Sequence, residues 1–122
     1  MKITATLRQV NDSIPFLKEI VSKNISFNIG YKLYQLSEKL DKVIEYMRNR
    51  ITKEINGLDQ EEANQKVNEI LDTKIELDAD QINRDEFFKA IPKDLELPPI
   101  AFAAISFIFE EEAEEEAFKV VE

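Results

Sequence analysis

The chain lacks cysteine, histidine and tryptophan, and it has only two glycines in 122 residues. Without cysteine it forms neither a disulfide nor a thiolate nucleophile, and without histidine it loses a common metal ligand and general base. Two glycines are too few for the glycine-rich loops that bind phosphates through their backbone. We therefore expect no catalytic residues, no cofactor and no enzyme activity, with stability that comes from burial of apolar side chains.

The net charge is negative and is unevenly distributed along the chain. Of the formal net charge of −9, residues 110–122 contribute −6 through seven glutamates and one lysine. Binding to DNA or RNA relies on clustered lysine and arginine, so we expect no direct contact with nucleic acid, whereas a basic protein partner fits. The longest apolar run, residues 98–109 interrupted by Ser106, is shorter than the roughly 20 residues that cross a bilayer, so we expect no membrane span. The first residues alternate between apolar and polar side chains, so they do not form the continuous apolar core of a secretion signal.

Two short segments carry the alternating pattern of half-buried strands. In residues 2–7, Ile3, Ala5 and Leu7 fall on one face. Residues 73–78 show the same alternation of apolar and polar side chains, and they are the only segment suited to pair with the first one in a sheet. Because two strands alone are marginally stable, helices must cover one face of the pair.

The strongest pattern in the chain predicts one long helix over residues 28–56. Apolar residues recur there in steps of three and four, most positions between them are charged or polar, and Gly57 follows as a stop. The repeating residues are Ile29, Leu33, Leu36, Leu40, Val43, Met47, Ile51 and Ile55.

Shorter helices are predicted before and after the long helix in the sequence. Polar N-cap residues precede Pro15, which is tolerated in a first turn. Asp59 and Glu62 have the spacing of a capping box, and Pro92 ends a later helix. The predicted ranges are 13–23, 59–71, 84–91 and a hydrophobic final helix from Ile100, which is apolar on all sides. The sequence thus predicts an α+β, mostly α fold, with a single domain over 1–109 and an acidic extension over 110–122.

A metal site is the first alternative to a binding function. The body of the chain has one dense acidic cluster, and hard cations take oxygen ligands. Its members are Asp72, Glu76, Asp78, Asp80, Asp85 and Glu86. Ile82 stands where a calcium loop that starts at Asp78 needs its third ligand, and the central glycine and the final bidentate glutamate are both missing, so we expect no metal.

Nucleic-acid binding is the second alternative. The long helix carries six basic residues, namely Lys32, Lys39, Lys42, Arg48, Arg50 and Lys53. Binding would also need interleaved exposed aromatic residues, and only Tyr31, Tyr34 and Tyr46 are available. A solvated helix face with i,i+4 ion pairs explains the same residues.

The length of the long helix suggests a contact surface. About 28 residues at about 1.5 Å each make a rod of roughly 42 Å, whereas a compact domain of this size has a radius of gyration of about 14 Å. Part of its apolar face is therefore expected to need cover from a partner protein or a second copy. The predicted partner-binding residues are Leu36, Leu40, Val43, Met47 and Ile51 on this helix, and Phe102, Ile105 and Phe109 on the last one.

Three segments carry a resemblance to a known group of proteins. They are Met1-Lys2-Ile3-Thr4, Ile29-Gly30-Tyr31-Lys32-Leu33-Tyr34-Gln35-Leu36 at the start of the long helix, and Ile70-Leu71-Asp72-Thr73-Lys74-Ile75-Glu76-Leu77. In this order they resemble small uncharacterised proteins of tailed phages and prophages. The resemblance implies a phage gene product that acts in the host cytoplasm or in a virion.

The sequence therefore favours a non-catalytic protein-binding or assembly protein, accessory or virion-associated, that acts through helical apolar contacts with itself or with another protein. The alternative is an acidic inhibitor of a bacterial defence or nucleic-acid-binding enzyme, whose carboxylates stand in for phosphates. Those carboxylates belong to Glu110, Glu111, Glu112, Glu114, Glu115 and Glu116.

Overall fold

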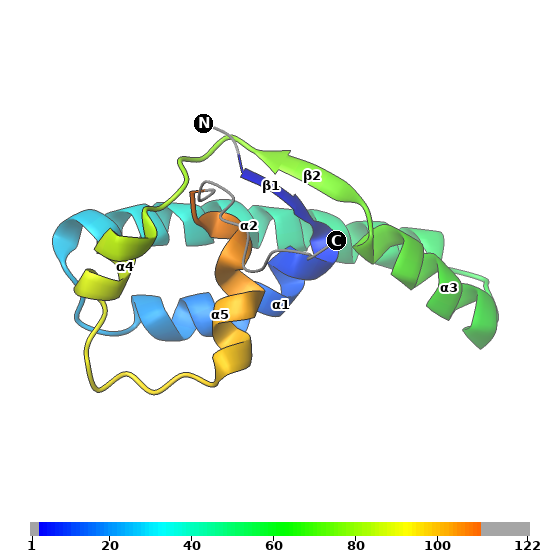
Figure 1. The fold of residues 1–122 in the computed structure, drawn as a ribbon. Helices are drawn as coiled ribbons and strands as arrows, with labels where there is room; N and C mark the ends of the chain where they lie inside the picture. The colour runs from blue at the N-terminus through cyan, green and yellow to red at the C-terminus, as the bar shows by residue number, and fades with distance from the viewer. Residues whose placement is uncertain (1–2, 111–122) are drawn as a thin grey trace, which may run out of the picture.

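The computed structural model describes residues 3–110. Over this range the chain forms a two-stranded sheet, five α-helices and one 3₁₀ turn (Figure 1). The predicted α+β, mostly α fold with a long central helix is confirmed.

The two strands are β1 (Ile3–Thr6) and β2 (Lys74–Leu77), and they pair antiparallel. Each predicted strand is present and is shorter by one residue at either end. Ile3 faces Leu77 in the register, and both side chains are buried. The pair therefore has one face in the core and the polar residues on the other, as the alternation predicts.

Helix α1 (Leu7–Val21) begins six residues before the predicted start at residue 13. Thr6 ends β1 and also caps α1, because its hydroxyl accepts from the Gln9 backbone N–H at 3.1 Å while the Gln9 side chain accepts from the Thr6 N–H at 2.9 Å. Pro15, expected in a first turn, lies inside the helix on its exposed side. The carbonyl that would bond to its missing N–H belongs to Asn11, which is itself an exposed residue.

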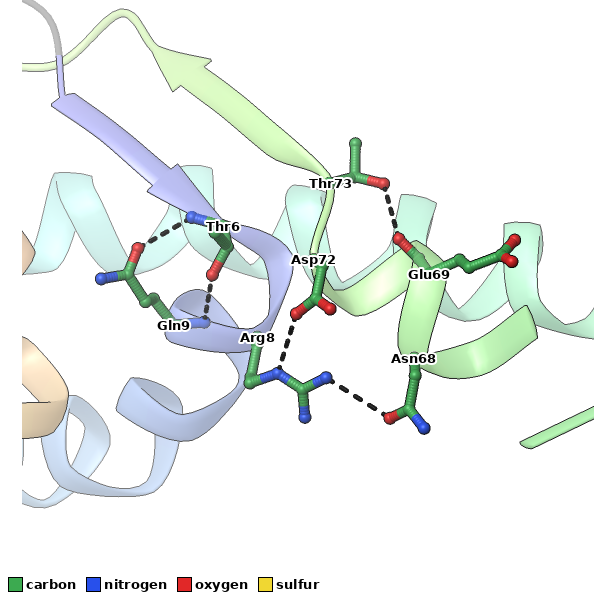
Figure 2. Close-up of polar contacts among 7 residues, drawn as sticks. All are labelled: Thr6, Arg8, Gln9, Asn68, Glu69, Asp72 and Thr73. Atoms are coloured by element: carbon green, nitrogen blue, oxygen red, sulfur yellow. Dashed lines mark hydrogen bonds and ion pairs between the residues drawn. The ribbon is translucent and has the colours of Figure 1, made fainter. Parts of the chain in front are cut away.

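A set of polar contacts fixes the β1–α1 junction against the start of β2 (Figure 2). The Arg8 guanidinium donates to Asp72 at 3.2 Å and to Asn68 at 3.4 Å. The Leu7 backbone N–H donates to the carbonyl of Thr73 at 3.0 Å. Two segments at least 60 residues apart are thereby held together where the sheet meets the helices.

The long helix α2 (Phe27–Glu54) matches the prediction closely, starting one residue earlier and ending two earlier. Gly57 follows with a φ of +83°, a conformation that favours glycine, and the chain reverses into α3 (Gln60–Leu71). Asp59 caps α3 by accepting from the Glu62 N–H at 2.8 Å. Helix α3 then packs back against α2 (Figure 1).

The last third of the chain holds α4 (Arg84–Ala90), α5 (Pro99–Ile105) and the 3₁₀ turn η1 (Ser106–Ile108). The predicted final helix from residue 100 is therefore present but short. The Ile82 N–H donates to the last carbonyl of η1 at 2.9 Å, and its carbonyl accepts from the Glu110 N–H at 3.0 Å. These two bonds hold the end of the described chain in an extended form beside Ile82.

Helix α1 packs against α2 and also against α5, which lies across it (Figure 1). A single apolar cluster connects the sheet, α1, α2 and the last segment. Its fully buried large side chains are Phe87, Ile3, Leu7, Leu17, Ile20, Leu33, Leu40, Ile70, Ile82, Ile105, Ile108 and Val10.

Candidate protein-binding surfaces

The predicted partner-binding residues of α2 lie on the face that its own chain covers. Leu36, Leu40 and Met47 are buried, and Val43 and Ile51 are half-buried and pack against the same core. The structure thus assigns the first three to the core and leaves them no exposed area for a partner. The physical reason is that α1 lies along this face and α3 folds back over the far end, so the rod is covered within one chain.

The predicted residues of the last segment are also largely enclosed. Ile105 and Phe109 are buried, and Phe102 is half-buried against Phe88 with ring centroids 5.8 Å apart. The Arg84 guanidinium lies over the Phe109 ring, 5.1 Å from its centroid. Ile105 and Phe109 therefore build the core under α4 and α5, and they are not available as contact residues.

An apolar groove lies between α1 and α5. Its volume is about 590 Å³, and apolar side chains from both helices form most of its lining. They are Pro15, Phe16, Ile100, Ala103 and Ala104. Ile100 is 68% exposed, although the next residue of α5, Ala101, is fully buried. Helix α5 thus uses one apolar face for the core and presents a second one to solvent.

Polar residues line the groove on its α1 side. Gln9, Asn11 and Asp12 are all exposed, and Asp12 is the one charged residue among those that line the groove. An apolar floor with a polar edge is the arrangement of a protein contact site. We refer to the eight lining residues together as the α1–α5 groove.

A second exposed apolar surface lies on the outer face of α2. Phe27, Tyr31 and Tyr34 follow at i, i+4 and i+7 and are 80%, 52% and 52% exposed. The Phe27 and Tyr31 rings stack with centroids 5.7 Å apart and planes 10° from parallel. A hydrogen bond with Glu38 raises the pKa of the Tyr34 hydroxyl. We call these three residues the aromatic stripe.

Neither surface is among the predicted contact residues, although the sequence carried a signal for both. A segment that is apolar on all sides, as in α5, indicates contact on more than one face. The aromatic stripe has helical spacing, but Tyr31 and Tyr34 are predicted as candidates for stacking on nucleic acid and not as contacts with a protein.

Two further ionisable groups with altered pKa, Arg50 and Glu54, lie at the end of α2, away from both surfaces. Arg50 Nε donates to Glu54 Oε2 at 2.6 Å, and Lys66 Nζ of α3 lies 3.4 Å from Glu54 Oε1. The hydrogen bond from Arg50 lowers the pKa of Glu54 and raises that of Arg50. This cluster ties α3 to α2 near the turn that joins them.

Most of the predicted acidic surface, Glu111, Glu112, Glu114, Glu115 and Glu116, lies outside the described residues. Glu110 is exposed, and its carboxylate accepts from the Asn83 side chain at 3.4 Å. Among residues 3–110 no group of three or more acidic side chains is placed to hold a metal ion. Within the same range, no helix has both the length and the apolar character that a bilayer crossing requires.

The comparisons with known proteins add no relative. No protein-family model matches the chain, and neither a curated protein nor a solved structure does so.

Proposed function

We propose that this chain is a non-catalytic protein-binding protein whose α1–α5 groove receives a short amphipathic helix of a partner. The observation that carries the proposal is the 68% exposure of Ile100 in a groove whose lining is mostly apolar. Exposed apolar patches with a polar edge mark interaction sites, and a groove between two helices accepts the apolar face of a third.

Charge determines the kind of helix that fits. The chain carries −9 overall, and Asp12 is the charged residue on the edge of the groove. A partner helix with apolar residues at i, i+3 and i+4 and a lysine or arginine beside Asp12 satisfies both features. The setting that we propose for this contact is the one implied by the phage resemblance, a host cytoplasm or a virion.

The acidic-inhibitor function is the second candidate, and the seven glutamates among residues 110–122 favour it. It differs from the first in where the partner binds. A phosphate-mimicking contact depends on the acidic extension and weakens steeply with salt, whereas a contact in the groove is largely apolar.

Capture of a partner from a phage-infected host lysate separates these functions when four forms of the chain are compared. They are the wild type, Ala103→Glu, Gln65→Glu and a chain that ends after Glu110. Ala103 lines the groove, and Gln65 is an exposed residue of α3, so the two substitutions add the same charge at different places. Capture that Ala103→Glu removes and Gln65→Glu retains supports the groove. Capture that only the shortened chain loses supports the inhibitor and refutes the groove.

A further inference from the structure

The described residues leave the α1–α5 groove uncovered. Ile100 is 68% exposed, and its groove neighbours Pro15 and Ala103 are exposed as well. Single exposed apolar residues are common on protein surfaces, but here several of them line one hollow of about 590 Å³. Such a surface gains free energy when apolar side chains replace the water on it.

The sequence has a segment of matching character shortly after the described range. Residues 110–122 contain seven glutamates, but Ala117-Phe118-Lys119-Val120-Val121 interrupts them with four apolar residues out of five. Lys119 is the single cation of this stretch. An apolar run with one positive charge is the counterpart of an apolar groove with one negative charge, and Asp12 is the one charged residue that lines the groove.

We propose that residues 117–121 bind in the α1–α5 groove of their own chain, with Phe118 and the two valines on its apolar floor and Lys119 beside Asp12. The groove then has an occupant before any partner arrives. That a partner must displace this segment rests on the proposed function, whereas the occupancy itself does not.

The connection between the groove and the segment is long enough. Ala104, which lines the groove, lies six residues before Glu110, and this stretch includes the 3₁₀ turn η1. At about 2 Å per residue in the turn and about 3.4 Å beyond it, the stretch spans roughly 15 Å. Residue 117 lies seven residues after Glu110, and seven residues can span up to about 24 Å. The return path therefore exceeds the distance that it has to cover.

Charge decides which part of residues 111–122 binds. The connection, residues 111–116, carries five glutamates. An ionised carboxylate loses its hydration in an apolar groove, and near Asp12 it would also meet a like charge. The apolar run at 117–121 is therefore favoured in the groove, and the glutamates before it are favoured in water.

The covalent connection compensates for the small size of the contact. It makes binding intramolecular, at an effective concentration in the millimolar range for a short connection. A contact with a dissociation constant of about 0.1 mM between separate molecules would then keep about nine-tenths of the grooves occupied. About a tenth of the grooves would remain free for a partner, which lowers the apparent affinity of that partner about tenfold.

A spin label placed directly after the segment tests the proposal in the full chain. The sequence has no cysteine, so Glu122→Cys provides a single site for a nitroxide. The label should broaden the NMR methyl signals of Ile100 and Ala103 in the groove. The methyl signal of Ala63, near the start of α3, should stay sharp and serves as the internal reference.

A substitution within the segment shows whether the apolar run carries the binding. Phe118→Glu in the labelled chain should reduce the broadening at Ile100 about threefold or more, because it replaces the largest apolar side chain of the run by a carboxylate. Ala113→Glu is the matched control. It adds the same charge to the connection, outside the apolar run, and should leave the broadening unchanged.

Exchange of the two charges gives a second readout. Asp12→Lys and Lys119→Asp should each reduce the broadening at Ile100, because each places like charges side by side. The double variant restores an opposite pair and should recover most of the broadening. A change that Asp12→Lys causes only within α1 would not be reversed by the second substitution.

Equal broadening with and without Phe118→Glu overturns the proposal. Broadening at Ala63 as strong as at Ile100 also overturns it, because the segment then has no preference for the groove. Partner capture is a separate measurement, in which Phe118→Glu frees the groove and should raise the apparent affinity up to about tenfold. If the labelled chain shows an occupied groove and Phe118→Glu leaves capture unchanged, the occupancy stands and the proposed function fails.

Discussion

Replacing Leu40 by alanine tests whether the apolar face of α2 serves the core of its own chain. Leu40 is fully buried near the middle of the longest helix, within the cluster that joins α1 to α2. Truncation of a buried leucine removes three carbon atoms and leaves a cavity that the surrounding side chains fill only in part. The free energy of unfolding should fall by about 3 kcal/mol, within the range of about 2.7–5 kcal/mol for such sites.

That loss is large compared with the total free energy of unfolding of a domain of this size. Single domains of this size are stable by about 5–15 kcal/mol, so the variant should unfold at a clearly lower urea concentration and about 10 °C below the wild type. The measurement is urea unfolding at low micromolar protein concentration, followed by far-UV circular dichroism. Leu58→Ala is the matched control, because Leu58 is 38% exposed and the same truncation there should cost less than about 0.5 kcal/mol.

If Leu40 instead belonged to a partner contact, the isolated chain would not need it. Leu40→Ala would then unfold at the same urea concentration as Leu58→Ala, with a loss below about 1 kcal/mol. That result would refute the assignment of this face to the core and would restore the long helix as an unfinished contact surface.

Three further substitutions probe the local devices of the fold. Thr6→Ala removes the cap between β1 and α1 and should lower the free energy of unfolding by about 1 kcal/mol in the same urea assay. Ser37→Ala should leave the urea midpoint unchanged or raise it, by up to about 1 kcal/mol in stability, because the buried Ser37 hydroxyl has no hydrogen-bond partner among the described residues. Glu54 has a folded pKa below its unfolded value of 4.5, so its ion pairs with Arg50 and Lys66 stabilise the chain above that pH and lose their effect as the pH falls through the lowered value. The stability difference between wild type and Glu54→Gln should therefore shrink on acidification, and a difference that grows at low pH would contradict this sign.

The sequence was most informative where one local signal dominated. The bounds of α2 were predicted to within two residues, because eight apolar residues at helical spacing outweigh any competing pattern. The two strands were found by alternation alone, but their direction required the register in space. Gly57 marked the end of the long helix and lies in the turn that follows, at a φ of +83°.

The start of α1 was missed because two signals competed. Asn11, Asp12 and Ser13 look like caps before Pro15, and this pattern hid the Thr6 and Gln9 pair that caps the helix in the structure. Residues 7–12 were therefore left out of the helix, although Leu7 and Val10 are buried on its inner face. A strand that passes directly into a helix leaves no loop residues to mark the boundary.

The candidate site was harder to predict for a different reason. Periodicity indicates which face of a helix is apolar, but it does not show whether the same chain covers that face. For α2 the cover comes from α1 and α3, which depends on the turns at both ends of the helix. For α5 the outer face is left open, and only the packing of α5 on α1 reveals that Ile100 and Phe16 line one groove.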